Sequence, residues 1–151
     1  MTDIDGRLRL YLPFLHGFYD SAAPLAWPIV RLAVGWNLAV HGWGKVMAGP
    51  AALAKGFVDL GFHDPKTLIV LLTFVEFVGG ICIALGFFTR FFAAAVAIEM
   101  AYITFGLYWP TGFSWLRRGY EYTLMWGLIS FAISLQGGGA YSLDRIVGRE
   151  L

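Results

Sequence analysis

Residues 65–88 read PKTLIVLLTFVEFVGGICIALGFF, an apolar run with a single acidic residue, Glu76, near its middle. About twenty mostly apolar residues are enough to cross the roughly 30 Å hydrocarbon layer of a bilayer as a helix. Asp64 precedes the run as a candidate N-cap, and Pro65 occupies the first turn, where a missing N–H costs least. This stretch therefore predicts a transmembrane helix.

Three further apolar segments lie at about 22–46, 91–109 and 119–135. Ser21 is a candidate N-cap for the first, Pro110 stops the third, and the triple glycine 137–139 suits the end of the fourth. The sequence thus predicts an all-α membrane protein in which residues 1–151 form one domain, an antiparallel bundle of four transmembrane helices. Both termini then lie on one side of the membrane, here called face B, and the opposite side is face A.

Composition agrees with a membrane location. Hydrophobic residues make up 58% of the chain and charged residues 14%, against about 45–50% and 25% in soluble domains. The lipid bilayer is therefore the expected partner. The formal net charge of +1 gives no reason to expect nucleic acid binding.

The connection between the first two predicted spans contains a second kind of helix. Leu53, Phe57 and Leu60 repeat at helical spacing, while Lys55 and Asp59 lie four residues apart on the other side. This pattern is typical of a short amphipathic helix in the membrane interface, over about 51–61 on face A.

The orientation of the chain is not decided by its basic residues. Face B holds five lysines and arginines and face A also holds five, so the positive-inside rule gives no preference: Arg7, Arg9, Arg90, Arg145 and Arg149 against Lys45, Lys55, Lys66, Arg117 and Arg118. The short polar N-terminus favours cytoplasmic termini.

Ionisable residues inside the spans are the candidate functional residues: Arg31, His41, Lys45, Glu76, Glu99 and Glu121. A charge at mid-bilayer costs at least about 2.5–3.5 kcal/mol, so such groups normally face the bundle interior and pair. The depth of each residue below face A follows from its distance to the end of its span, at about 1.5 Å per residue. Opposite charges at similar depth predict two ion pairs, Arg31 with Glu76 and Lys45 with Glu121. A purely structural role, fixing the register of the helices, is the alternative interpretation for these pairs.

Helical phase supports an interior of this kind. Residues 31, 35, 38, 42 and 45 form one stripe of the first span, and residues 73, 76, 80 and 83 form one stripe of the second. Glycines in both stripes let the two backbones approach closely. Glu99 has no evident cationic partner, although His41 could approach it, and an unpaired buried carboxyl group would carry its proton at neutral pH.

The residue types exclude several chemistries. The three histidines, His16, His41 and His63, are far apart in sequence, and the chain has one cysteine, Cys82. Neither a two-histidine haem site, nor a metal-ligand spacing, nor a glycine-rich nucleotide loop is present. A redox role would therefore need a bound organic cofactor such as a quinone, or a partner subunit.

An ordered set of short motifs resembles the DoxX family. The set runs from Arg31 through His41-Gly42-x-x-Lys45, Glu76 with Gly79-Gly80, Gly86-x-x-Thr89-Arg90 and Glu121 to Ser142-Leu143-Asp144. The resemblance implies a small four-helix protein of the bacterial inner membrane. It also implies a place beside membrane oxidoreductases, since relatives of the DoxD type are described as membrane subunits of a thiosulfate:quinone oxidoreductase.

The leading hypothesis is a membrane subunit that docks a redox partner and offers a quinone-accessible pocket. Arg31, Glu76 and Glu121 would line it, His41 or Lys45 would hydrogen-bond a quinone carbonyl, and three aromatic residues would flank the ring: Trp43, Trp109 and Tyr122. Two alternatives remain open. One is a non-enzymatic assembly subunit of a larger complex, and the other is a transporter for a small solute built at a homo-oligomer interface.

Overall fold

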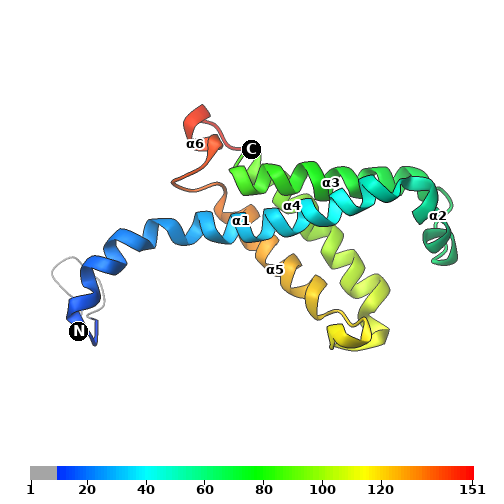
Figure 1. The fold of residues 1–151 in the computed structure, drawn as a ribbon, viewed down its shortest axis with the longest axis horizontal. Coiled ribbons are helices and arrows are strands. Elements are labelled where there is room, and N and C mark those ends of the chain that lie inside the picture. The colour runs from blue at the N-terminus through cyan, green and yellow to red at the C-terminus, as the bar shows by residue number, and fades with distance from the viewer. Residues whose placement is uncertain (1–9) are drawn as a thin grey trace.

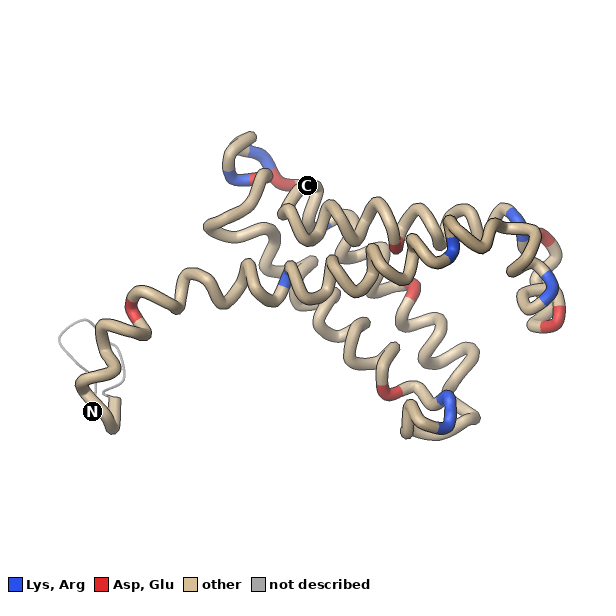
Figure 2. Tube along the Cα trace, in the orientation of Figure 1, with Lys and Arg blue, Asp and Glu red and all other residues tan. Residues whose placement is uncertain are grey.

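The computed structural model describes residues 10–151, which form helices, turns and loops without a strand. Within residues 10–151, three helices are long and apolar enough to cross a membrane: Pro13–Ala48, Pro65–Leu85 and Thr89–Thr111. The chain is therefore an integral membrane protein. Charged residues gather near the ends of the long helices and are sparse along their middles (Figure 2).

The helices follow one another in a simple order (Figure 1). They are η1 (Pro13–Leu15), α1 (His16–Ala48), α2 (Pro50–Asp59), α3 (Pro65–Leu85), α4 (Thr89–Ala101), the π-helix η2 (Tyr102–Tyr108), η3 (Trp109–Thr111), η4 (Trp115–Arg117), α5 (Glu121–Gln136) and α6 (Leu143–Val147). α3 returns beside α1, and α5 lies beside α4. The pair α4–α5 crosses the pair α1–α3 at an angle, and the two pairs diverge toward the end that carries α2, η3 and η4.

Close backbone contact joins α1 to α3, as the glycine stripes predicted. A Cβ atom added to Gly35 would lie 2.4 Å from the carbonyl oxygen of Gly80, and one added to Gly42 would lie 2.4 Å from the nitrogen of Phe77. Only glycine allows these approaches, because any side chain there would meet backbone atoms of the neighbouring helix. The predicted packing faces of the two helices are therefore confirmed.

The start of α1 differs from the prediction. The helix begins at His16 rather than near residue 22, and Ser21 lies inside it, donating a hydrogen bond to the carbonyl of Gly17 at 2.8 Å instead of capping the helix. Pro24 and Pro28 are thus interior residues. At 33 residues, α1 is about 50 Å long, and its first turns extend beyond the other helices (Figure 1). Arg7 and Arg9, which entered the prediction of orientation, lie outside the described residues.

The turn between α3 and α4 begins earlier than predicted. Asp64 caps α3 as expected, and the helix ends at Leu85 because Gly86 takes the left-handed conformation, with φ of +70°. Phe88 also has a positive φ, of 47°. α4 then begins at Thr89, two residues before the predicted start of the third span.

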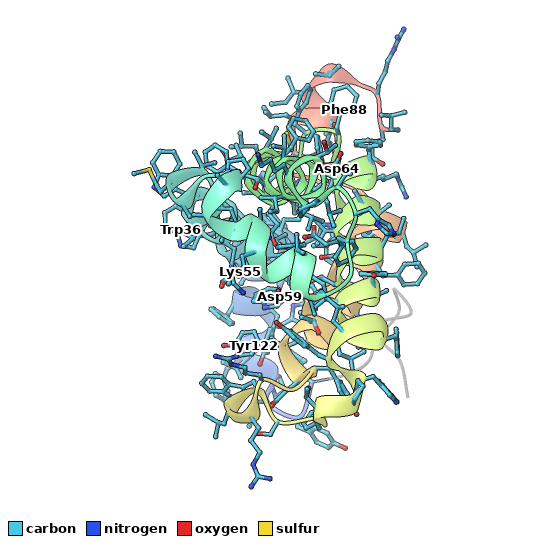
Figure 3. The ribbon with its side chains drawn as sticks, turned by 90° about the vertical axis from the view of Figure 1, so that its right-hand side faces the viewer. Trp36, Lys55, Asp59, Asp64, Phe88 and Tyr122 are labelled. Carbon is cyan, nitrogen blue, oxygen red and sulfur yellow. The ribbon has the colours of Figure 1, made fainter. Side chains whose placement is uncertain are left out.

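The helix predicted near residues 51–61 is present as α2, over Pro50–Asp59. Lys55 and Asp59 form an exposed ion pair at 3.0 Å and are seen on α2 in Figure 3, while Leu53 and Phe57 are half-buried. α2 packs against the adjoining ends of α1 and α3. The apolar residues Leu53 and Phe57 are thus more buried than the charged residues of α2, as its amphipathic pattern predicts. The place of α2 in the membrane interface stays a prediction.

The apolar core lies where the two helix pairs meet. Val34 and Leu38 from α1, Ile83 from α3, Val96 from α4 and Ile133 from α5 are all buried in it. This core holds α1, α3, α4 and α5 together where the two pairs cross, and the pairs separate beyond it toward the diverging end.

Candidate functional site

An ion pair links α1 to α3 at the end where the helix pairs diverge. The Nζ atom of Lys45 lies 2.8 Å from the Oε2 atom of Glu76, and the side chain of Glu76 is 6% exposed. The predicted pairs Arg31–Glu76 and Lys45–Glu121 are therefore both wrong, because Lys45 occupies the position expected for Arg31. Breaking a buried pair of this kind leaves an uncompensated charge, which costs about 3–5 kcal/mol.

Glu99 of α4 lies next to this pair. Its side chain is buried, and its carboxyl group lies within hydrogen-bonding reach of the carboxyl group of Glu76. Both Glu76 and Lys45 interact with it electrostatically. His41 does not approach Glu99 as a counter-ion but is exposed. The structure thus brings two carboxyl groups and one ammonium group together inside the apolar part of the molecule.

A cavity of about 290 Å³ opens beside the Lys45–Glu76 pair. Its walls come from both helix pairs and consist of Asn37, Leu38, His41, Lys45, Glu76, Met100, Ile103, Tyr108, Tyr122, Thr123 and Trp126. Ligand pockets are typically apolar with a few convergent polar groups, and this cavity has that composition. Its volume is at the lower end of the usual range, about 300–1,000 Å³, which suits a single ring.

Six of the lining residues were not identified from the sequence: Asn37, Met100, Ile103, Tyr108, Thr123 and Trp126. A signal for Asn37 is present, because Asn37, His41 and Lys45 recur every four residues and so share one side of α1. Tyr108 and Thr123 carry no such signal, since their positions depend on η2 and on the direction of α5.

The three aromatic residues predicted to flank a ring lie in different places. Tyr122 lines the cavity, on the α5 side of the molecule (Figure 3). Trp43 instead packs against Phe77, with ring centroids 5.6 Å apart, and Trp109 stacks on Tyr120 at 4.7 Å. Of the three, only Tyr122 can contact a ligand in this cavity.

The π-helix η2 helps to shape one wall. It continues α4 over Tyr102–Tyr108 and contributes Ile103 and Tyr108 to the cavity. Thr104 is buried within it and donates a hydrogen bond to the Oγ1 atom of Thr123 on α5, at 2.8 Å. π-Helical turns are rare and often occur at functional sites, and here the wide turns decide which side chains of the helix face the cavity.

Arg31 lies away from the cavity and is held by the C-terminal segment, residues 137–151. Its Nη1 atom donates to the carbonyl of Gly138 at 2.6 Å, and its Nη2 atom donates to the carbonyl of Tyr141. Trp27, one turn earlier on α1, donates to the carbonyl of Gly137 at 2.8 Å. Backbone carbonyl groups therefore solvate the guanidinium group of Arg31, and the carboxylate of Asp144 also attracts its charge.

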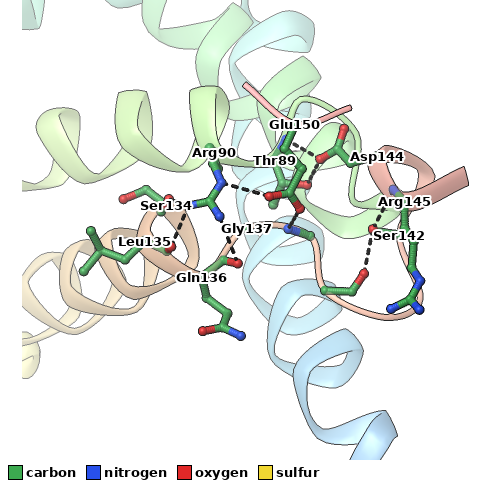
Figure 4. Close-up of polar contacts among 12 residues, drawn as sticks. Thr89, Arg90, Ser134, Leu135, Gln136, Gly137, Ser142, Asp144, Arg145 and Glu150 are labelled. Carbon is green, nitrogen blue, oxygen red and sulfur yellow. Dashed lines mark hydrogen bonds and ion pairs between the residues drawn. The ribbon is translucent and has the colours of Figure 1, made fainter. Parts of the chain in front are cut away.

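The same C-terminal segment also caps α4 (Figure 4). The carboxylate of Asp144 accepts hydrogen bonds from the nitrogen atoms of Phe88 and Thr89 and from the hydroxyl of Thr89. Arg90 forms an ion pair with Glu150 at 2.9 Å and donates to the carbonyl of Ser134. These contacts fix the ends of α1, α3, α4 and α5 to one another.

Glu121 begins α5 and faces the preceding loop. Its Oε2 atom accepts a hydrogen bond from the backbone nitrogen of Trp115 at 3.2 Å. It does not line the cavity beside Lys45, although the next two residues of α5, Tyr122 and Thr123, do. α5 and α1 diverge toward this end (Figure 1).

Comparisons with known proteins identify the family. A model of the DoxX family matches residues 26–109. The chain belongs to the DoxX family. An uncharacterized protein of Haemophilus influenzae is 31% identical over an alignment of 133 residues, which covers 83% of this chain and 92% of the relative. The inner membrane protein YqjF of Escherichia coli is 31% identical over 125 residues, with 81% and 92% covered. No solved structure matches the chain.

The DoxX match divides the polar residues of the molecule into two sets. Arg31, Lys45, Glu76 and Glu99 lie inside the matched region, whereas Asp144 lies outside it. Within residues 10–151, no group of three histidine, cysteine, aspartate or glutamate side chains is placed to hold a metal ion. The cavity beside Lys45 and Glu76, two residues inside the matched region, is the candidate site of this DoxX protein.

Proposed function

We propose that this DoxX protein is a membrane subunit of a quinone-linked oxidoreductase and binds a quinone in the cavity beside Lys45. The observation that carries the proposal is an ammonium group, paired with a carboxylate, in the wall of a cavity that is otherwise mostly apolar. A quinone is a flat apolar ring with carbonyl oxygens, and a cationic donor strengthens a hydrogen bond to such an oxygen.

The cavity offers a place for each part of this ligand. Lys45 and the Tyr122 hydroxyl can donate to carbonyl oxygens, while Trp126 and Met100 provide apolar and aromatic contact with the ring. His41 and Asn37 are exposed on α1 at the rim, so a ligand can enter from the lipid side. The electrons for its reduction would come from a redox partner subunit, as the family resemblance implies.

The proposal includes a four-span topology. α5 has 16 residues and is about 24 Å long, slightly short of the hydrocarbon thickness, but it pairs along α4. With α5 as the fourth span, the molecule is an antiparallel four-helix bundle whose termini share one side. The name of the Escherichia coli relative supports the bacterial inner membrane as its location. The proposal places both termini in the cytoplasm.

The test is quinone binding by the purified full-length protein in nanodiscs. Decylubiquinone should quench tryptophan fluorescence in a saturable way, because Trp126 lines the cavity. Lys45→Met should weaken binding about tenfold or more, since a hydrogen bond from a charged group contributes about 1.5–3 kcal/mol. Lys55→Met, which removes an exposed lysine, is the matched control and should bind like the unaltered protein.

Two results would reject the proposal: no saturable binding by the unaltered protein, or an unchanged affinity in folded Lys45→Met protein.

A non-enzymatic assembly role is the second candidate, and the part of α1 that extends beyond the other helices favours it. Deleting residues 10–20 should then remove the partner complex from the membrane without changing quinone binding.

A further inference from the structure

Glu99 is a buried acidic residue whose carboxyl group lies within hydrogen-bonding reach of Glu76. It is 7% exposed, and both of its carboxyl oxygens are inaccessible to solvent. The ionisable groups that act on it are Glu76 from α3 and Lys45 from α1. The ionisable groups of the neighbouring cavity, His41, Tyr108 and Tyr122, line its other walls.

The charges of Lys45, Glu76 and Glu99 do not balance if both carboxyl groups are ionised. Lys45 is 2.8 Å from Glu76 and supplies one positive charge for two carboxylates. A second carboxylate, buried in a membrane protein without its own counter-ion, costs several kcal/mol. One added proton removes this cost and leaves the group neutral.

We propose that Glu76 and Glu99 share a single proton, which is stored on Glu99 and reaches the cavity through Glu76. Glu76 lines the cavity and Glu99 does not, so Glu76 is the link between the buried carboxyl group and a bound ligand. The storage of the proton on Glu99 is independent of the ligand, whereas its delivery to a quinone rests on the proposed function.

The transfer between the two carboxyl groups is a simple exchange. The O–H bond of Glu99 breaks, an O–H bond forms on Glu76, and no electron changes hands. The total charge of Lys45, Glu76 and Glu99 is the same before and after, since the negative charge only moves from Glu76 to Glu99. Lys45 interacts with both carboxyl groups and can therefore stabilise either arrangement.

The infrared carbonyl band of a protonated carboxyl group measures this state directly. The purified full-length protein in nanodiscs should show such a band at pH 7 that is absent from Glu99→Gln. Lys45→Met should increase the band about twofold, because without the ammonium group both carboxyl groups take up a proton. Glu76→Gln should abolish the band although Glu99 is intact, because Glu99 then ionises as the partner of Lys45.

Glu121→Gln is the matched control, since Glu121 lies apart from this group and its loss should leave the band unchanged. A missing band in the unaltered protein, a band retained by Glu99→Gln or Glu76→Gln, or one unaltered in Lys45→Met would each overturn the proposal. The result is separable from the quinone test, because the band is read without ligand. Decylubiquinone that binds to a protein without the band would reject proton storage and keep the quinone site.

Discussion

The hydroxyl of Thr89 donates a hydrogen bond to the Oδ2 atom of Asp144 at 2.6 Å, and its backbone nitrogen donates to the same oxygen at 3.0 Å. The other carboxylate oxygen, Oδ1, accepts from the nitrogen of Phe88 at 2.8 Å. Asp144 thus satisfies free N–H groups at the start of α4, where a negative charge also interacts favourably with the helix dipole. One side chain from the C-terminal segment completes a helix that begins 55 residues earlier.

Replacing Asp144 should destabilise the protein strongly. Asp144→Ala leaves buried donors without an acceptor, and we expect the free energy of unfolding to fall by about 3 kcal/mol. Asp59→Ala removes an exposed aspartate of an ion pair on α2 and should cost less than about 0.5 kcal/mol. Denaturant unfolding in detergent compares the two variants, and equal stabilities would mean that the C-terminal segment does not hold the bundle.

Replacing Gly86, the glycine of the α3–α4 turn, should destabilise the protein. It has φ of +70°, and a Cβ atom there would lie 1.9 Å from the Nη1 atom of Arg31. Gly86→Ala should therefore lower the free energy of unfolding by about 2–4 kcal/mol, combining backbone strain with a steric clash. Gly148 has a similar φ of +75° but no atom within 4 Å of an added Cβ, so Gly148→Ala should show only the strain, about 1 kcal/mol. Thermal unfolding that ranks Gly148→Ala as the worse variant would contradict the clash.

The contact between α1 and α3 can be tested with two glycines of one helix. An alanine at residue 35 would place its Cβ 2.4 Å from the carbonyl oxygen of Gly80, whereas Gly44 has no atom within 4 Å. Gly35→Ala should cost about 1–3 kcal/mol, and Gly44→Ala should be neutral or slightly stabilising because alanine favours helices. The melting temperatures of the two variants give the answer. An unchanged melting temperature in Gly35→Ala would show that the two helices do not touch at this residue.

Lowering the pH should remove the stability that the Asp64 carboxylate adds as the N-cap of α3. Hydrogen bonds from Thr67, followed by the charge of Lys66, hold the pKa of Asp64 below its usual value. Because the folded-state pKa is lower than the unfolded-state pKa, the ionised cap stabilises the protein at neutral pH, and this contribution is lost as the pH falls through the folded-state pKa. Asp64→Ala should therefore be less stable than the unaltered protein at pH 7, with the difference shrinking below about pH 4. Asp64→Asn keeps a cap without a charge, and its stability relative to Asp64→Ala should not vary with pH in this way.

Periodicity along the sequence predicts the packing faces of this fold well. Gly35, Gly42 and Gly80 occupy the closest contacts between α1 and α3, and their spacing alone identifies them, because the Cβ atom of any other residue would keep two helices apart. Lys45 and Glu76 also belong to these two stripes, so their meeting agrees with the predicted faces although not with the predicted pairs.

The wrong ion pairs have a physical explanation. Counting depth from the helix ends placed Arg31 near Glu76, but the acceptors of Arg31 are backbone carbonyls of the C-terminal segment, and every residue type has a carbonyl group. Glu121 is not the partner of Lys45 because its carboxylate faces the preceding loop and accepts a hydrogen bond from the backbone nitrogen of Trp115. η2 was not predicted either, since its wide turns depart from the 3.6-residue period on which helical patterns rely.

The bonds of Arg31 to Gly138 and Tyr141 span 107 and 110 residues of the chain. A ribosome adding about 5–20 residues per second makes these carbonyl groups roughly 5–20 s after the arginine. During that interval the guanidinium group depends on water or lipid phosphates for its hydrogen bonds. α1 is therefore completed only by residues synthesised 107 and 110 positions after Arg31. A product truncated before residue 137 would expose an unsatisfied arginine by which quality control can distinguish it.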